Sequence, residues 1–154
     1  PSLERKWKIP TKPRGDEWTV PLPFQMDTQE EVYGLMMYIN EYFSAYTVES
    51  GQPFIVKDVK VFPEKLRVEV FMTLLPIESG VTQEFVIEAK VPEEENRWFF
   101  NLYIRRLSGV KELWIAVNRT IIDIIRKQIL LWGSLPESER MKYMKGTAEH
   151  KMEE

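Results

Sequence analysis

The sequence predicts a single domain of the α+β class, and three observations lead to this prediction. The chain has 154 residues, the usual length of one domain. Apolar residues recur at helical spacing in some stretches and alternate with polar residues in others. The predicted elements run in the order helix, three-stranded antiparallel meander, helix, one or two further strands and C-terminal helix. Each strand of the meander has one polar face, which is typical of an antiparallel sheet covered on one side only.

The composition excludes several kinds of site. Hydrophobic residues make up 44% of the chain, and a chain of this length can bury roughly 70% of its unfolded surface without a metal or a disulfide. There is no cysteine, which excludes disulfides, thiolate nucleophiles and thiolate metal sites. The first residues do not resemble a signal peptide, and no apolar run approaches the ~20 residues that span a bilayer. We therefore expect a cytoplasmic protein that does not enter the membrane.

Charge is distributed unevenly around the net value of −3. Residues 1–14 carry five basic residues and one acidic residue, a net charge of +4. Residues 15–56 carry seven acidic residues and no lysine or arginine, and residues 57–154 hold sixteen charges of each sign. The sequence thus predicts a basic arm and an acidic segment beside a balanced body.

Proline separates the first part of the chain from the rest. Five prolines, the last of them Pro23, favour extended backbone over helix in residues 1–26. Residues 18–24 suit an edge strand, where proline is tolerated. We expect an extended basic and aromatic arm over residues 1–26, a single domain over residues 27–146 and a frayed charged tail over residues 147–154.

The first helix is predicted over residues 28–48. Thr28 and Glu31 have the spacing of a capping box, in which the hydroxyl and the carboxylate each accept from an unpaired backbone N–H. Ser50 and Gly51 are expected to end the helix. Its apolar stripe consists of Val32, Leu35, Met36, Ile39, Tyr42, Phe43 and Tyr46.

Three strands are predicted next, over residues 54–62, 65–74 and 83–91. The alternation of the first strand shifts near Asp58, which indicates a bulge. The second and third strands alternate regularly, so that one face of each is apolar. The inward-facing residues of these two strands are Leu66, Val68, Val70, Met72, Leu74, Phe85, Ile87, Ala89 and Val91.

A second helix is predicted over residues 92–107. Pro92 suits its first position, and the acidic residues at its start and the arginines at its end both suit the helix dipole. Residues 112–118 are predicted to form a fourth strand. Residues 120–132 fit a helix by apolar spacing and a strand by their many β-branched residues.

The last predicted helix begins near Ser134. Ser134 and Glu137 have capping-box spacing around Pro136. Met141, Met144 and Ala148 supply an apolar stripe, and the helix is expected to end near residue 145.

This order of elements resembles the type III secretion chaperone-like fold that YbjN-like proteins share, over about residues 28–145. The likeness depends most on residues 98–109, taken as a helix before a glycine-bearing turn into the strand at Glu112. Members of that family usually have a fifth strand before the last helix, so the resemblance favours a strand at residues 120–131. It implies a homodimer that binds another polypeptide, and it carries over no catalytic residue.

The residues offer little catalytic chemistry. The one histidine, His150, lies in the charged tail, so a nucleophilic triad would lack an ordered base. We expect no cofactor and no metal site. An enzyme or small-ligand pocket remains an open hypothesis, based on Asp123 as a buried carboxylate; an outward-facing position explains Asp123 more simply. The acidic run at residues 93–95 suits a helix start better than a magnesium site.

The basic arm is one candidate interaction surface. Trp7 lies between Lys6 and Lys8, and cations beside a stackable ring suit single-stranded nucleic acid. The isoelectric point of 5.4 and the acidic segment that follows disfavour a polyanion. Two interpretations compete with nucleic-acid binding. The arm packs on the acidic face of the first helix, its own or that of a dimer mate, or it is a solvated tail whose tryptophans fill the core. A contact with a partner protein is a further alternative.

Residues 98–100 form a second candidate surface. A helix cannot place three consecutive aromatic residues on one stripe, because neighbours point about 100° apart. One of them should therefore be exposed or covered by another element or subunit. We expect a noncatalytic protein-binding or chaperone-like module that forms a homodimer, and the alternative is a nucleic-acid-associated adaptor that uses the basic arm. The candidate interaction residues are Trp7, Lys8, Trp18, Trp98, Phe99, Phe100 and Tyr103.

Overall fold

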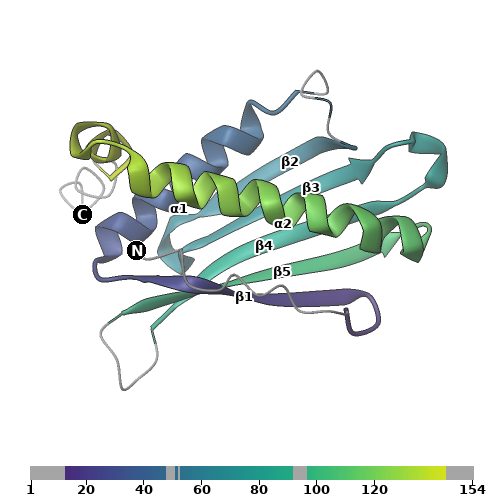
Figure 1. The fold of residues 1–154 in the computed structure, drawn as a ribbon, viewed down its shortest axis with the longest axis horizontal. Coiled ribbons are helices and arrows are strands. Elements are labelled where there is room, and N and C mark those ends of the chain that lie inside the picture. The colour runs from purple at the N-terminus through teal and green to yellow at the C-terminus, as the bar shows by residue number, and fades with distance from the viewer. Residues whose placement is uncertain (1–12, 48–50, 52, 92–96, 145–154) are drawn as a thin grey trace.

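The computed structural model describes residues 13–47, 51, 53–91 and 97–144. It shows a mixed α+β fold in which helices lie on one face of an antiparallel sheet (Figure 1). The described helices and strands are β1 (Glu17–Met26), α1 (Gln29–Ser44), β2 (Phe54–Phe62), β3 (Arg67–Leu74), β4 (Thr82–Lys90), β5 (Trp98–Ser108) and α2 (Lys111–Ser134), followed by a C-terminal helix over residues 137–144.

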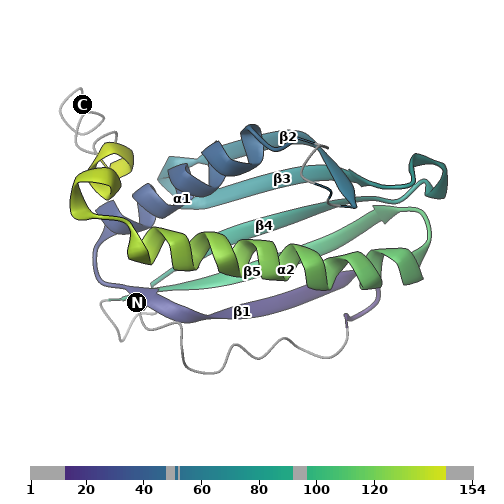
Figure 2. The ribbon, with the colours of Figure 1, turned by 45° about the horizontal axis from the view of Figure 1, so that its top comes forward.

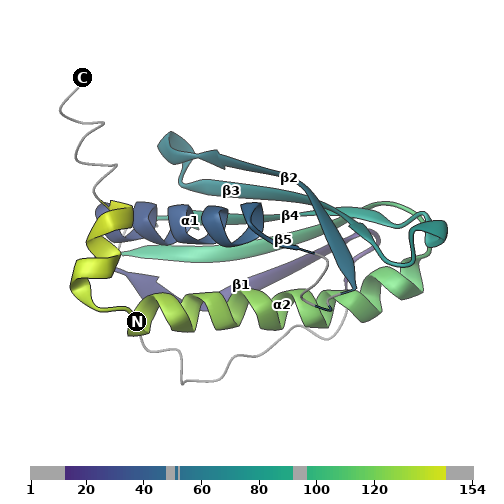
Figure 3. The ribbon, with the colours of Figure 1, turned by 90° about the horizontal axis from the view of Figure 1, so that it is seen from above.

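The five strands form one sheet in the order β1-β5-β4-β3-β2, and every neighbouring pair is antiparallel. Both α1 and α2 lie on the same side of this sheet, as the view from above shows (Figure 3). Helix α1 packs on β2 and β3, whereas α2 contacts β5 and α1. The apolar core therefore lies between the two helices and one face of the sheet, and the opposite face carries no described helix (Figures 2 and 3).

The meander confirms the predicted alternation. Val70 and Met72 of β3 and Phe85 and Ile87 of β4 are fully buried on the helix side of the sheet. The predicted bulge near Asp58 is present, since the register between β2 and β3 shifts between Val56 and Asp58. One inward-facing prediction was wrong, because β4 ends at residue 90 and Val91 is 44% exposed. Leu66 lies in the turn before β3 at φ 49°, yet it is partly buried and packs against the core.

Helix α1 also follows the sequence. The Thr28 hydroxyl accepts a hydrogen bond from the backbone N–H of Glu31 at 3.2 Å, which caps the helix start as predicted. The helix ends at Ser44, earlier than expected, with Ala45 as its C-cap. Its stripe of Val32, Leu35, Met36, Ile39 and Phe43 is buried against the sheet.

The predicted helix over residues 92–107 was wrong where the structure describes it. Residues 98–108 form β5, which lies between β1 and β4 in the sheet. Phe100, Leu102 and Ile104 alternate toward the core with Asn101 and Tyr103 on the other face, a period of two. Burial on the core side of a sheet accounts for this alternation, and hydrogen bonds to both neighbouring strands satisfy the backbone. The predicted helix start at residues 92–96 lies outside the described residues.

The predicted strand over residues 112–118 and the strand favoured for residues 120–131 were also wrong. Both stretches belong to the single helix α2. Trp114, Ile121, Ile125, Ile129 and Trp132 are buried along it, and these positions recur every three, four or seven residues. Packing against the sheet overrides the weak strand preference of the isoleucines. The stretch that carried the family resemblance thus contains a strand followed by a helix.

A C-terminal helix follows α2, as predicted, but it begins differently. The Ser134 hydroxyl donates to the carbonyl of Leu131 at 2.9 Å inside α2, so it does not form the predicted capping box. The backbone N–H groups of Glu139 and Arg140 bond instead to the carbonyl of Pro136. Leu135 and Pro136 therefore provide the sharp turn between the two helices.

The part of the expected arm that is described belongs to the sheet. Residues 17–26 form β1, which pairs with β5 from Glu17↔Arg105 to Met26↔Trp98. The predicted edge strand at residues 18–24 is confirmed, and the domain therefore starts before residue 27. Pro21 lies on an edge strand, where proline is tolerated because one side of the strand has no partner. Residues 1–12 and 145–154 lie outside the described residues.

Gly34 allows α1 to approach the end of α2. A Cβ atom at Gly34 would meet Trp132 Cη2 and Met144 Cγ at 2.6 Å each, so no larger residue fits. We expect Gly34→Ala to lower the free energy of unfolding by about 1–3 kcal/mol, although alanine favours helices by ~1 kcal/mol over glycine. Urea unfolding measures this loss. Gly133→Ala is the matched control, because nothing lies within 4 Å of its added Cβ and it should stabilise the protein. Equal effects of the two changes would contradict the close contact at Gly34.

Candidate binding surfaces

The structure separates the aromatic residues predicted to interact. Trp18 and Phe100 are each 1% exposed and belong to the core, so neither is available to a partner. Phe100 stacks on Phe24 of β1 with ring centroids 4.5 Å apart. Trp98 is half-buried and packs against the core from the same side of the sheet. Packing among these aromatic residues holds β1 against β5.

Phe99 and Tyr103 lie on the helix-free face of the sheet, and both are half-buried. The strand alternation of β5 explains how three consecutive aromatic residues are accommodated, since Phe99 points away from its two neighbours. Trp7 and Lys8 lie outside the described residues, as do the acidic residues 93–95. Asp123 is exposed on α2, which is the simpler of its two predicted positions. Within the described residues there is no group of three or more potential metal-ligating histidines, cysteines or carboxylates.

The helix-free face carries a hollow of about 340 Å³. Thr19, Val86 and Tyr103 line its floor, and charged residues surround them. Arg67 contacts Glu69 at 2.7 Å and Glu88 at 3.0 Å, and Arg105 contacts Glu84 at 3.1 Å. The charges of this surface therefore largely neutralise one another, and they favour neither an anionic nor a cationic ligand.

Glu88 on this face forms ion pairs with two basic residues. Lys90 reaches its second oxygen at 3.2 Å while Arg67 holds the first. Partial burial works against ionisation, but the hydrogen bonds and charges of Lys90 and Arg67 outweigh it and lower the pKa of Glu88. Glu88 thus stays ionised and links β3 to β4 across the sheet.

Two buried amides face the core. Gln83 of β4 and Asn118 of α2 are both 0% exposed, and neither side-chain amide has a hydrogen-bond partner among the described residues. An unpartnered amide in a core costs roughly 1–3 kcal/mol. These two amides are therefore unfavourable groups in a mainly apolar interior.

Most of the tyrosines lie on a different surface. Two adjoining hollows of about 540 and 450 Å³ lie where α1 meets the C-terminal helix, and Glu41, Ala45 and Tyr143 line both. We call this pair of hollows the tyrosine groove. Five of the six tyrosines of the chain line it. Its lining residues are Tyr33, Met37, Asn40, Glu41, Ser44, Ala45, Lys142 and Tyr143 in the larger hollow, with Tyr38, Tyr42, Tyr46, Thr47 and Gln128 added in the smaller one.

Three packed rings hold the groove together. Tyr38 of α1 lies 5.7 Å from Trp132 of α2 and 5.2 Å from Tyr143 of the C-terminal helix, measured between ring centroids. Trp132 and Tyr143 are 6.0 Å apart, so each ring contacts the other two. Edge-to-face packing of this kind adds about 0.5–1.5 kcal/mol per pair beyond the area buried. The cluster joins three helices, and it positions Tyr143 between the two hollows.

The groove is polar at its centre. The Tyr143 hydroxyl lies within hydrogen-bonding reach of the Glu41 carboxylate. Burial and the nearby charge of Glu41 raise the pKa of both Tyr38 and Tyr143, and burial raises the pKa of Tyr42. These phenols therefore remain neutral donors with intact π faces over the whole physiological range. The arrangement suits binding through rings and hydrogen bonds rather than proton transfer.

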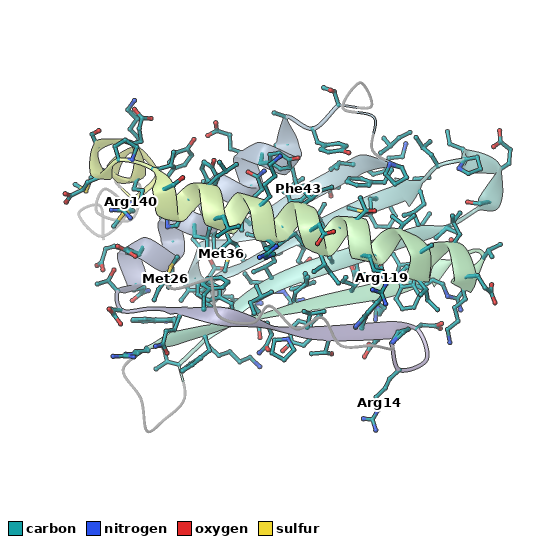
Figure 4. All side chains as sticks on the ribbon, viewed as in Figure 1. Arg14, Met26, Met36, Phe43, Arg119 and Arg140 are labelled. Carbon is teal, nitrogen blue, oxygen red and sulfur yellow. The ribbon has the colours of Figure 1, made fainter. Side chains whose placement is uncertain are left out.

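The groove residues were not among the predicted interaction residues. Tyr42 and Tyr46 were assigned to the buried stripe of the first helix, and they are half-buried at its margin. One signal was present in the sequence, because Tyr38, Tyr42 and Tyr46 recur every four residues and share one side of a helix. Tyr143 could not be added from the sequence, since its approach to α1 depends on the turn at residues 135–136. Arg140 of the C-terminal helix and Arg14 before β1 lie far apart in the molecule (Figure 4).

Comparison of the chain with protein-family models, curated proteins and solved structures finds no match. Among the described residues, no helix has the length and hydropathy needed to cross a bilayer.

We expect Asn118→Leu to raise the free energy of unfolding by about 1–2 kcal/mol, because it removes an unpartnered amide from the core and keeps the branching of the side chain. Chemical denaturation of the full chain measures the change. A loss of stability would show that the Asn118 amide has a partner in solution.

Glu88→Gln should lower the free energy of unfolding by about 1 kcal/mol at neutral pH, because a neutral amide at this position cannot form an ion pair with Arg67 or Lys90. The folded pKa of Glu88 lies below its unfolded value of about 4.3, so its contribution is complete above that pH and is lost as the pH falls through the folded pKa. Urea unfolding at neutral pH and near pH 3 should show the difference between the two proteins shrinking in acid. Glu64→Gln, at an exposed site, should change little at either pH. A difference independent of pH would assign the effect to packing instead of charge.

Proposed function

We propose that this protein is a noncatalytic polypeptide-binding module and that the tyrosine groove is its binding site. The observation that carries the proposal is the gathering of five tyrosines and Glu41 around two adjoining hollows on the solvent side of α1. Tyrosine presents a large apolar face and a hydroxyl together, and it loses little entropy when it is ordered. It is accordingly enriched at the centres of protein interfaces.

The chemistry of the lining supports binding over catalysis. Glu41 is the one carboxylate that lines the groove, and its described polar neighbours are phenols, amides, hydroxyls and Lys142. The raised pKa values of Tyr38, Tyr42 and Tyr143 make these phenols weaker acids, and they lower the fraction of phenolate that could act as a base at neutral pH. A general acid or base works best with a pKa near the operating pH, which these groups move away from.

The shape of the groove fits a polypeptide segment. The two hollows adjoin, and residues of α1 and of the segment just after it, from Tyr33 to Thr47, line them. A ligand that fills both must span this distance along α1 and present side chains at two points. A short peptide with two anchoring side chains meets this requirement.

The test is selection of short peptides from a random library against the full chain, followed by titration of the selected peptides into isotope-labelled protein. We expect dissociation constants on the order of 10 µM and shifts concentrated at α1 and residues 137–144. Ala45→Trp should weaken binding at least about tenfold, because Ala45 is exposed and lines both hollows.

Ala116→Trp provides the matched control, since Ala116 is also an exposed alanine but lies in the first half of α2. It should leave binding unchanged. Peptides whose shifts map to the helix-free sheet face would move the binding site and contradict the proposal. Oligonucleotides that bind more tightly than any peptide would favour the alternative adaptor function.

A further inference from the structure

Glu41 lies among aromatic rings on a helix that has no basic residue. No lysine or arginine occurs between residues 15 and 56, and α1 carries Glu30, Glu31 and Glu41. The Glu41 side chain is exposed, and the Tyr143 hydroxyl lies within reach as a hydrogen-bond donor. A carboxylate has about four acceptor positions, so it can accept further donors without losing this one.

The rings around Glu41 supply a second source of attraction for a cation. The negative face of an aromatic ring attracts an ammonium or guanidinium group placed within about 6 Å of its centroid. Tyr33 and Tyr143 line the larger hollow with Glu41, and Tyr38, Tyr42 and Tyr46 line the smaller one. Each hollow therefore combines the Glu41 carboxylate with two or more π faces, the combination that recognises lysine and arginine side chains. The larger hollow is also lined by Lys142, whose ammonium is paired with Glu139.

The charge of the surrounding helices acts in the same direction. Within the described residues, α1 and the C-terminal helix together carry five carboxylates and two basic side chains. Of these two, Lys142 is held by Glu139 at 3.0 Å on its own helix. An approaching basic segment thus meets a net negative surface, whereas the ion pairs of the helix-free sheet face offer no such preference.

We infer that the tyrosine groove takes lysine or arginine side chains of a basic polypeptide segment, with Glu41 as the counter-charge and the tyrosines as a cage for the cation. This inference rests on the proposed function and names its ligand class. The larger hollow takes one cationic side chain between Tyr33 and Tyr143, and the smaller one takes a second beside Tyr38 and Tyr42.

The experiment titrates the full chain with four synthetic peptides of one serine and leucine background that carry lysine, arginine, glutamine or glutamate at the same positions. We expect the lysine and arginine peptides to bind at least about tenfold more tightly than the glutamine peptide, and the glutamate peptide to bind least. Higher salt should weaken the basic peptides selectively, because the attracting charges are exposed.

Glu41→Gln should weaken the basic peptides about fivefold more than it weakens the glutamine peptide, so that the preference for a cation falls. Glu78→Gln is the matched control, since Glu78 is exposed in the turn between β3 and β4, at the opposite end of the molecule. Tyr33→Phe should keep the preference for lysine, whereas Tyr33→Leu should reduce it, because only the aromatic face attracts the cation. Circular dichroism confirms that each variant is folded.

The outcomes separate this inference from the proposed function. If the glutamine peptide binds the groove as tightly as the lysine peptide, and Glu41→Gln changes neither, then the cation inference is overturned while the binding module stands. If neither these peptides nor selected ones shift the groove residues, both fail. Binding of choline or free arginine as tight as that of the basic peptides would replace the polypeptide by a small cation, which also overturns the inference.

Discussion

The contact between Gly34 and Trp132 is the constraint on which the rest of the structure depends. The sheet has one apolar face, and two helices must cover it side by side. Because Gly34 has no side chain, the Trp132 ring and Met144 can lie directly on the backbone of α1. This approach buries Trp132 to 1% exposure and brings Tyr143 within 5.2 Å of Tyr38. The candidate site therefore results from the packing of the helices over the core, and it depends on the close contact of Trp132 and Met144 with α1.

The two faces of the sheet differ in composition: one is apolar and buried, and the other is polar and carries ion pairs. On the helix side, alternate residues of β3, β4 and β5 are removed from water almost completely, which supplies the hydrophobic free energy of folding. On the other side, Arg67, Glu88 and Lys90 pair with one another, so the surface stays polar without a large field. The exposed edges are also protected against pairing with another sheet, by Pro21 on β1 and by the bulge and charged residues of β2. At the junction of α1 with the C-terminal helix, by contrast, several tyrosine rings lie beside the Glu41 carboxylate.

The sequence predicted those elements whose local signals agree with their packing. Thr28 and Glu31 mark the start of α1, and the strict alternation of β3 has no helical interpretation. The predictions were wrong in segments where the apolar residues fit both the spacing of a helix and the alternation of a strand. Trp98, Phe99, Leu102 and Tyr103 satisfy helical spacing, yet Phe100, Leu102 and Ile104 also alternate, and only pairing with β1 and β4 decides between them. In α2 the isoleucines suggested a strand, but one continuous buried stripe over 24 residues outweighs their individual preferences. In both cases the deciding interactions join residues distant in the sequence.

The site was less predictable than the fold for the same reason. The spacing of Tyr38, Tyr42 and Tyr46 places three rings on one side of a helix, but it does not distinguish a buried stripe from an accessible one. What distinguishes them is the position of Tyr143, far along the chain in the C-terminal helix, which covers part of the stripe and leaves hollows on either side. The Tyr143 hydroxyl would lose its acceptor if Glu41 were absent, and Glu41 would be an ordinary solvated charge if Tyr143 did not reach it. The site therefore depends on both residues together. It forms only because the turn after α2 places the C-terminal helix against α1, and this contact between distant segments cannot be predicted from the sequence.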